Sequence, residues 1–417
     1  MVRQSRSRAI MIALTLSATA ALGTVARTAP QGHHPVASGG PCPLDPALTC
    51  VMSGLDSPRG LAFGPEGALY VVEAGSGAGV GVIITPATDP RCFLTNIGSR
   101  QCYGTTGAVT RLWRDTQERI VTGLPSTSFP KGPRGLGAAD IGFNGRGDAY
   151  VTIGWENDPT ARFTNPLLPD LPQFANLIHV SASGNWRSVA DLGAFEADAN
   201  PDRGQVDTDP FGLLVEPDGV VIADAGANDL IRVSRSGEVS LLATFPSRSS
   251  TPPRPSFAPP PNLQTSDAVP TCVVAGPDGA YYIGELTGIP FTDKRANIYR
   301  LDPATDAVPH TFTLDEAFLT GFKNIIDMAF ADDGTLYVLQ HATGALQMTG
   351  LGVLIKVVPD KSQSDIRLQY QLGTRGTVIA DLHEPTSVAI GPDDKLYVSI
   401  RGTTAGGGEV IRVPRQP

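Results

Sequence analysis

The sequence has little of several features that mark common protein classes. Only 18% of the 417 residues are charged, the formal net charge is −9, and Lys and Arg form no cluster. Binding to duplex nucleic acid needs a basic face that displaces counterions, so nucleic acid is excluded as a partner. No later apolar run reaches the roughly 18 residues of a transmembrane helix, so we expect no transmembrane anchor. No P-loop, Gly-x-Ser-x-Gly or His-Glu-x-x-His motif is present, which leaves nucleophilic catalysis without support.

The N-terminus indicates export. Arg3, Arg6 and Arg8 precede an apolar run of small residues at 9–22, as in a secretory signal peptide. We therefore expect a signal peptide at 1–26, an N-terminal extension at 27–49 and a folded domain at 50–417. The mature protein is expected to be secreted, to the extracellular space or the periplasm.

Five cysteines in an exported chain suggest disulfides. Spacing alone favours two local bridges, Cys42 with Cys50 and Cys92 with Cys102, although four cysteines allow three pairings. Cys272 remains, in an apolar segment that favours a buried thiol over a reactive one. No Cys/His spacing typical of a zinc site occurs.

A repeated pattern organises the chain. The sequence contains 46 Gly and 36 Pro, which argues against a largely helical protein. An apolar strand, a Gly-Pro-Asp-Gly-like turn and a second apolar strand recur six times, and each copy predicts a hairpin whose turn residue adopts a positive φ. The copies are 61–72, 141–152, 213–224, 273–284, 328–339 and 388–399, with turn residues Gly67, Gly147, Gly219, Gly279, Gly334 and Asp394.

Further strands follow each hairpin, so four strands repeated six times predict an all-β, six-bladed β-propeller with four-stranded blades. Third strands start near 108, 177, 230, 297, 353 and 410, and fourth strands are expected at 118–124, 187–192, 239–245, 310–314 and 366–372. The sixth copy ends without a fourth strand. Residues 50–55 match the pattern of a fourth strand, so the N-terminal strand is predicted to complete the last blade and close the ring.

Candidate functional residues come from the repeat register. The residue seven before each turn position should line the central channel, which places Asp140 and Asp327 in opposite blades. Two interpretations stay open: a carboxylate pair that binds a divalent cation such as calcium, with Arg59 nearby, or carboxylates that cap neighbouring loop amides. His341, just after a second strand, is a further candidate at the channel mouth.

Other repeated or acidic residues favour structural roles. Glu73, Glu285 and Gln340 share one register at the end of second strands, where we expect them to tie down the next turn. Five tyrosines in another register are expected to pack between blades: Tyr70, Tyr150, Tyr282, Tyr337 and Tyr397. The loop 195–212 is acidic enough for calcium, but lacks EF-hand spacing and favours a solvated turn cluster; its carboxylates are Glu196, Asp198, Asp202, Asp207 and Asp209.

Several segments resemble the ScyD/ScyE family of exported NHL-like β-propellers, which is associated with scytonemin biosynthesis clusters. The segments are 54–75, 104–112, 195–202, 209–214, 228–233 and 280–288. The resemblance covers nearly all of the mature chain and implies a six-bladed fold. It carries over no catalytic residue.

A second similarity is to gluconolactonase-like propellers, in which a channel metal activates water. Their Gly-Glu-Gly-Pro-x-Trp opening is absent here, because the corresponding stretch at 57–63 reads SPRGLAF. The sequence therefore favours a recognition or assembly module that binds a small molecule or an extracellular protein through its channel-mouth loops. The alternative is a metal-dependent hydrolase or lyase, lactonase-like, with its site at the same channel.

Overall fold

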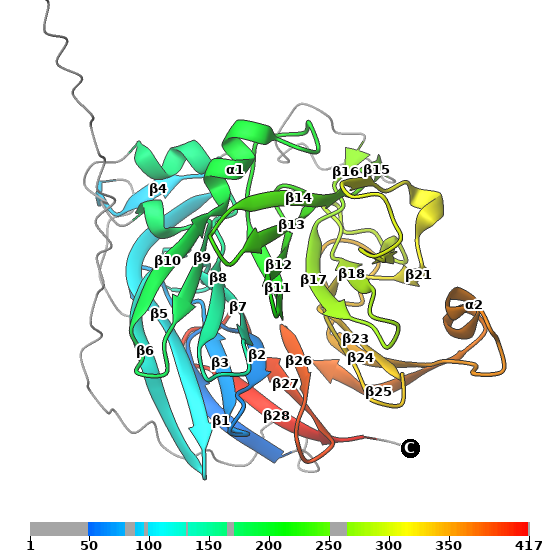
Figure 1. The fold of residues 1–417 in the computed structure, drawn as a ribbon. Coiled ribbons are helices and arrows are strands. Elements are labelled where there is room, and N and C mark those ends of the chain that lie inside the picture. The colour runs from blue at the N-terminus through cyan, green and yellow to red at the C-terminus, as the bar shows by residue number, and fades with distance from the viewer. Residues whose placement is uncertain are drawn as a thin grey trace, which may run out of the picture.

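Six antiparallel sheets form a closed ring in the computed structural model (Figure 1), which describes residues 49–79, 88–95, 99–130, 132–164, 171–250 and 265–415. From the channel outward, blade one holds β2 (Pro58–Phe63), β3 (Leu69–Glu73), β5 (Arg100–Trp113) and β6 (Thr116–Ser128); blade two holds β7 (Ala138–Phe143), β8 (Ala149–Ile153), β9 (Asn176–Val180) and β10 (Trp186–Asp191); and blade three holds β11 (Pro210–Glu216), β12 (Gly219–Asp224), β13 (Asp229–Ser234) and β14 (Val239–Thr244). Blade four holds β17 (Pro270–Ala275), β18 (Tyr281–Glu285), β19 (Ala296–Leu301) and β21 (Leu319–Phe322); blade five holds β22 (Ile325–Phe330), β23 (Leu336–Gln340), β24 (Gly352–Val358) and β25 (Thr374–Leu382); and blade six holds β26 (Ser387–Ile390), β27 (Lys395–Ile400), β28 (Gly408–Pro414) and β1 (Thr49–Leu55). The predicted propeller is confirmed.

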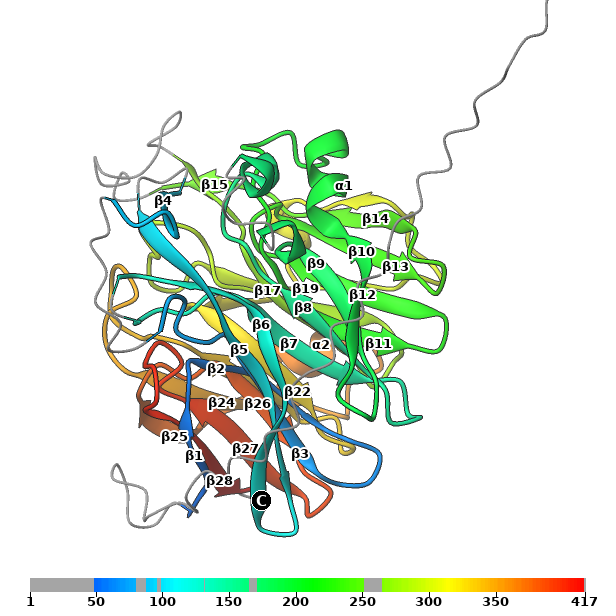
Figure 2. The same cartoon turned by 90° about the vertical axis from the view of Figure 1, so that its left-hand side faces the viewer.

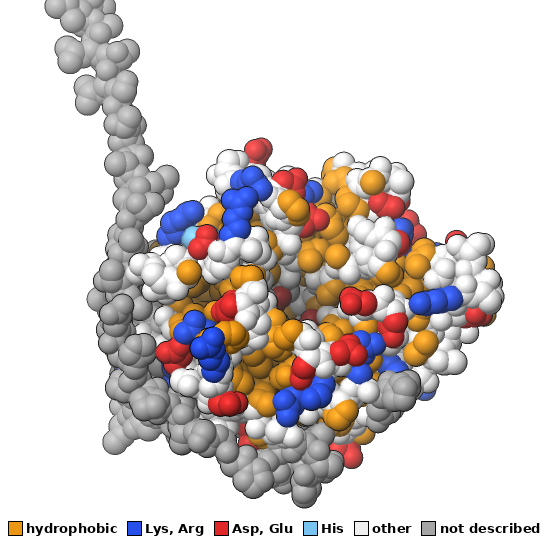
Figure 3. Space-filling model, turned by 60° about the horizontal axis from the view of Figure 1, so that its bottom comes forward, with side chains coloured by type: hydrophobic (Ala, Val, Ile, Leu, Met, Phe, Trp, Pro, Cys, Tyr) orange, Lys and Arg blue, Asp and Glu red, His pale blue; other side chains and the backbone are white. Residues whose placement is uncertain are grey.

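The six innermost strands surround the channel. Each contacts the innermost strand of the next blade, and β26 of blade six contacts β2 of blade one. One face of the molecule is hollowed at its centre, and acidic side chains are visible inside the hollow (Figure 3).

The N-terminal strand closes the ring, as predicted. β1 pairs with β28 in antiparallel register from Thr49 opposite Arg412 to Leu55 opposite Gly408. Leu55 is fully buried, as is Met52. The side-chain amide of Gln117 in blade one exchanges two hydrogen bonds with the main chain of Ser53, at 3.2 and 2.9 Å. The closing strand is therefore fixed on both sides.

Hairpin turns mostly follow the predicted chemistry. Gly67 has φ +85° and Asp394 has φ +57°, so Asp takes the left-handed position in the sixth copy. The prediction is wrong for Gly219, which pairs with Glu216 as the first residue of β12. The turn there contains only residues 217 and 218, so Gly219 already belongs to the strand and does not adopt a positive φ.

The tyrosine register packs mainly between blades. The ring of Tyr70 lies 4.7 Å from that of Phe143 in the next blade, and Tyr282 lies 4.9 Å from Phe330. Tyr397 contacts Phe63 across the joint between blades six and one, at 5.0 Å. Since these rings are buried in blade interfaces, they stabilise the ring and provide no ligand platform.

Two predicted fourth strands are wrong. Residues 310–314 were expected to complete blade four, but His310–Thr311 (β20) pairs in parallel with β14 of blade three, and β21 takes the outer place. Residues 366–372 were expected to complete blade five, but Ile366–Gln371 form helix α2 and β25 completes the blade. α2 lies at the outer edge of the propeller (Figure 1).

The remaining elements are inserted between blade strands. A short helix α1 (Leu192–Ala199) follows β10, and β15 (Arg248–Ser249) pairs with β16 (Thr265–Ser266) as a separate two-stranded sheet. The 3-10 helices η1 (Pro159–Phe163), η2 (Leu171–Gln173) and η3 (Leu314–Glu316) lie in further connections. Figure 2 shows α1 beside β10 and β14 at the edge of the ring. None of the described helices is long and apolar enough to cross a membrane.

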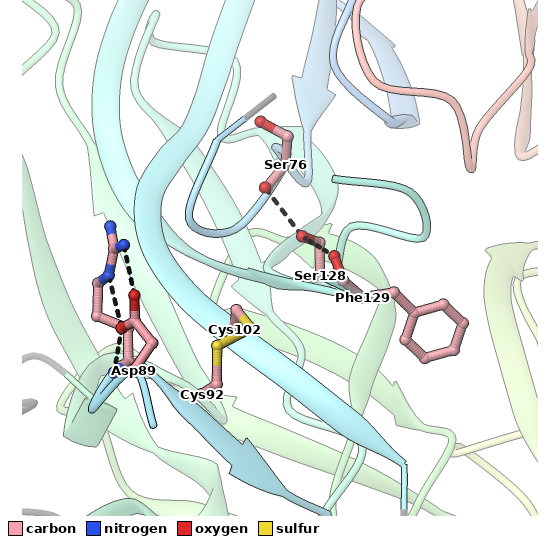
Figure 4. The surroundings of a disulfide bond; sticks show 7 residues. Ser76, Asp89, Cys92, Cys102, Ser128 and Phe129 are labelled. Atoms are coloured by element: carbon pink, nitrogen blue, oxygen red, sulfur yellow. Dashed lines mark hydrogen bonds and ion pairs between the residues drawn. A yellow bond between two sulfur atoms is a disulfide. The ribbon is translucent and has the colours of Figure 1, made fainter. Parts of the chain in front are cut away.

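One of the two predicted disulfides lies wholly within the described residues, and it is present. Cys92 in β4 (Cys92–Leu94) is bonded to Cys102 in β5 and fastens the long insertion of blade one (Figure 4). Cys42 lies outside the described residues, so its pairing with Cys50 stays a prediction. Cys272 is a free, buried thiol whose pKa is raised well above its usual value by burial, as the apolar sequence around it predicts.

Candidate functional site

Asp140 lies on β7 at the predicted channel position and is partly exposed. One oxygen of its carboxylate accepts the main-chain N–H of Ile141 at 2.8 Å. The other accepts the N–H of Leu213 in blade three, also at 2.8 Å. Gly60 is the matching residue in blade one, where an added Cβ would lie 2.1 Å from the Asp140 carboxylate. The carboxylate thus fills space that glycine leaves and joins two blades.

Asp327 makes the same kind of link from β22. It accepts the main-chain N–H groups of Met328 and Val388 at 2.8 Å and the hydroxyl of Ser387 at 2.6 Å. The Ser387 oxygen in turn accepts the N–H of Leu61 at 3.1 Å, so the chain of bonds crosses blades five, six and one. Both aspartates therefore cap main-chain amides, which is the second of the two sequence interpretations.

Burial is the main cause of the altered acidity of this pair. It raises the pKa of Asp327 to about 6. It also raises the pKa of Asp140 well above its usual range, and the negative charge of Asp327 raises the pKa of Asp140 further. Within the described part of the chain, no group of three or more Asp, Glu, His or Cys side chains is arranged to hold a metal ion. A cation bound by Asp140 and Asp327 stays a prediction.

The raised pKa of Asp327 predicts a pH dependence of stability. The folded state holds this proton more tightly than the unfolded state, whose carboxyl has the ordinary value of 3.8. The contribution of Asp327 to stability is therefore greatest at low pH and is lost as pH rises towards and through about 6. Urea unfolding at about pH 5 and about pH 7.5 should show a smaller pH-dependent loss in Asp327→Asn than in the parent protein.

The matched control for this measurement is Asp381→Asn, which changes an exposed carboxylate on β25. It should keep the parent pH dependence, whatever its absolute stability. An equal pH dependence in Asp327→Asn and the parent protein would rule out this role for Asp327.

A cavity of about 670 Å³ opens at one mouth of the channel. It is lined from five blades by the residue that directly precedes the channel position: Arg59, Phe211, Thr271, Ile326 and Thr386. The loops after the second strands provide further walls, among them His341. Of the four predicted site residues, the structure thus brings Arg59 and His341 to one cavity. Asp140 and Asp327 lie one register position further along their strands and are not among the lining residues.

Arg59 is buried and fixed at the wall of this cavity. Its two terminal nitrogens donate to the carbonyl oxygens of Gly402 and Gly135, both at 2.8 Å, which join blades six and two to blade one. Burial lowers the pKa of Arg59 to about 10, and the negative charge of Asp209 opposes this shift. Arg59 therefore remains cationic at neutral pH, with its main donors held by the propeller.

His341 offers a free acceptor to the cavity. Its Nδ1 lies 2.9 Å from the carbonyl oxygen of Pro385, so Nδ1 must carry the proton. Burial lowers the pKa of His341, and the neutral ring leaves an unprotonated Nε2, for which the described residues provide no hydrogen-bond partner. His341 can therefore accept a hydrogen bond from a ligand.

Two loop residues add an ion pair to the cavity lining. Arg134 forms an ion pair with Glu156 at 3.1 Å, and both side chains are partly exposed to the cavity. Asp209 accepts the main-chain N–H of Trp155 at 2.9 Å, and burial, with the charge of Glu156, raises its pKa well above the usual range. Arg134 and Glu156 lie outside the repeated strand pattern, and both have positive φ, which no sequence signal indicated.

The residues that end the second strands are structural, as predicted. Glu285 is fully buried, pairs with Arg248 at 2.5 Å and accepts the main-chain N–H of Asn297 at 3.1 Å. Burial raises its pKa to about 7, and Arg248 opposes this shift. Gln340 accepts the main-chain N–H of Lys323 at 2.9 Å. Glu285 thus holds the start of β19, and Gln340 holds the turn before β22.

Glu73 is the most heavily bonded member of this register. Its carboxylate is fully buried and accepts the main-chain N–H of Asp56 at 2.6 Å and the hydroxyl of Thr110. Arg119 on β6 donates hydrogen bonds to both carboxylate oxygens, through Nε at 2.9 Å and Nη2 at 2.7 Å. Glu73 thus joins three strands of blade one to the segment that follows β1.

No protein-family model matches the chain, and no curated protein matches it. Among solved structures, the PQQ-bound aldose sugar dehydrogenase of Streptomyces coelicolor is similar, with 11% identity, a TM-score of 0.45, and coverage of 88% of this chain and 96% of that one. Virginiamycin B lyase of Staphylococcus aureus aligns at 10% identity and a TM-score of 0.42, over 87% of this chain and 96% of that one. Likenesses this weak carry no functional argument, and the propeller assignment depends on the sheet topology above.

Proposed function

We propose that the chain is a secreted recognition module of the ScyD/ScyE type that binds a small organic molecule in the channel-mouth cavity. The observation that carries this proposal is the cavity itself, whose volume of about 670 Å³ falls within the range of about 300–1,000 Å³ of small-molecule sites. A largely apolar lining with a few fixed polar groups is also typical of such sites.

The lining suggests the chemistry of the ligand. Apolar side chains from the β6–β7 connection and from blades three, four and five face the cavity: Leu136, Phe211, Val269, Leu286, Phe291 and Ile326. His341 can accept one hydrogen bond through Nε2, and Arg134 can donate to an anionic or carbonyl group once it exchanges with Glu156. A planar apolar molecule with one donor and one acceptor fits this arrangement.

Filling the cavity should abolish binding of an aromatic probe. Leu136 is partly exposed in the cavity wall, so tryptophan at this position would occupy cavity volume without replacing a buried core residue. We expect the parent protein to bind anilinonaphthalene sulfonate at one saturable site, and Leu136→Trp to weaken binding by about tenfold or more. Fluorescence titration of the folded protein measures both.

The matched control is Leu372→Trp, which places the same side chain on an exposed leucine beside α2, 60% of whose surface is accessible. It should bind the dye as the parent protein does. Dye binding that is unsaturable, or equal in Leu136→Trp and the parent protein, would contradict a ligand site in this cavity.

The second candidate is a metal-dependent hydrolase or lyase at the same channel. It is favoured by the raised pKa values of Asp140 and Asp327, because perturbed carboxylates in a channel are common at catalytic sites. Metal-dependent turnover of a simple lactone that is lost in Asp327→Asn would favour this candidate. Absence of turnover, together with saturable dye binding, would favour the recognition module.

A further inference from the structure

The acidic loop 195–212 is only in part the solvated turn cluster that its sequence favoured, because Asp198 is exposed but Glu196 is buried. Glu196, in the last turn of α1, is only 1% exposed, and so is Asp229, the first residue of β13. Neither carboxylate has a hydrogen bond of normal geometry to any described residue, for either of its oxygens. Burying a carboxylate without hydrogen bonds or a counter-charge is expensive, so these four oxygens require an explanation.

A third residue adds an oxygen of the same kind. Asn200 caps the C-terminus of α1 in the left-handed conformation, and its side-chain oxygen is buried without a hydrogen-bond partner among the described residues. Its side-chain nitrogen donates to the carbonyl oxygen of Gly204 at 3.2 Å, which fixes the orientation of the amide. Glu196 and Asn200 are four residues apart, so they lie on one face of the helix.

The fold gathers these groups at one place. Asp229 is the partner of Asp224 in the β12–β13 ladder, and the neighbouring Asn228 donates to Asp202 at 3.0 Å, in the turn that follows α1. Burial is the main cause of the raised pKa of Asp229. The carboxylates of Asp224, Glu196 and Asp202 are close enough to raise this pKa further. The end of α1 lies beside blade three in both ribbon views (Figures 1 and 2).

The protein provides no counter-charge to these carboxylates among the described residues. The charged groups that act on Glu196 and Asp229 are themselves carboxylates, namely Asp202, Asp207 and Asp224. Asp224 already accepts the hydroxyl of Thr208 and three main-chain N–H groups. The C-terminal end of α1 adds the partial negative charge of its last carbonyl groups, which favours a cation.

We propose that Glu196, Asn200 and Asp229 bind a calcium ion between α1 and blade three. The donors are all oxygens, which selects a hard cation, and they come from a loop and a helix end, which suits the flexible coordination of calcium better than the strict octahedron of magnesium. Two carboxylates and an amide oxygen provide part of the six to eight ligands that calcium takes, and water and main-chain carbonyls complete the shell. The ion would balance the buried charge and fasten the loop 200–209, which also supplies Asp202, Gly204, Gln205 and Asp207 to the wall of the cavity.

The test is calcium binding by the full mature chain after treatment with a chelator. Titration calorimetry with calcium chloride should show one strong site per chain, and calcium should raise the thermal unfolding midpoint where equal magnesium does not. Glu196→Gln and Asp229→Asn should each weaken calcium binding by about tenfold or more, because each removes a charged ligand.

The matched control is Asp198→Asn, which removes an exposed carboxylate from the same helix and should keep the parent affinity. A parent protein that neither binds calcium nor is stabilised by it overturns the proposal, whether or not the variants fold. So does an equal loss of affinity in Asp198→Asn and Glu196→Gln. Stabilisation by Glu196→Gln with no calcium effect would also overturn it, because it would show that the buried charge of Glu196 is unfavourable and that no ion offsets it.

Discussion

Glu73→Ala is expected to lower the free energy of unfolding by about 2–5 kcal/mol, because donors around the buried carboxylate lose their acceptor at a cost of about 1–3 kcal/mol each. The loss leaves the main-chain N–H of Asp56, the hydroxyl of Thr110 and part of the Arg119 guanidinium without their acceptor. Because these donors lie on different strands, the effect should spread over blade one. Chemical denaturation followed by tryptophan fluorescence measures it.

A double-mutant cycle separates the ion pair from the other bonds. Arg119→Ala alone should cost less than Glu73→Ala, because Arg119 is 32% exposed and water can replace its contacts, whereas Glu73 is fully buried. The two effects should be clearly non-additive. Glu238→Ala, which removes an exposed glutamate in blade three, should change stability by less than about 0.5 kcal/mol. A Glu73→Ala effect as small as that control would refute the predicted role.

Removal of β1 is expected to abolish the stable monomeric fold. A chain that starts at residue 57 lacks the outer strand of blade six, which exposes the edge of β28 and the surface that buries Met52 and Leu55. It also loses the hydrogen bonds between Ser53 and Gln117 that join blades six and one. An exposed edge beside apolar surface favours association between chains, so we expect aggregates or dimers in size-exclusion chromatography.

The control chain starts at residue 41, which keeps β1 together with Cys42 and Cys50. It should remain monomeric and unfold in one cooperative transition. A synthetic peptide of residues 49–55 should partly restore the thermal midpoint of the shortened chain, since it supplies the missing strand. A shortened chain that is as stable and monomeric as the control would show that ring closure does not depend on β1.

The propeller was predictable because every blade repeats one hairpin, and the pairing of β1 with β28 followed from counting strands. The helix at Ile366–Gln371 was not, because apolar residues at 366, 368, 370 and 372 alternate as in a strand. Only one face of this helix is buried: Tyr370 packs inside the protein, whereas Leu368 and Leu372 are 43% and 60% exposed. The side chain of Asp365 accepts the N–H of Leu368 and caps the helix. An Asp at this position is a helix-start signal in the sequence, but the alternating apolar pattern favoured a strand.

The candidate site was predictable only where it follows the repeat. Arg59 and His341 lie at fixed distances from the hairpin turns, so the register placed both near the channel mouth. Arg134 and Glu156 come from connections with no repeated pattern. Glu196 and Asp229 are far apart in sequence, one on α1 and the other on a strand of blade three, so the acidity of one loop gave no indication of the second carboxylate.

Closure of the ring by β1 also determines where the molecule begins to unfold. The two strands of this joint lie at opposite ends of the described chain, so among the described strands their pairing closes the longest loop and carries the largest loop-closure entropy. The same joint is where the ring opens at least cost, since release of one outer strand leaves five blades intact. The lifetime of the native state, and its resistance to proteases, would then depend on how often seven residues detach from β28.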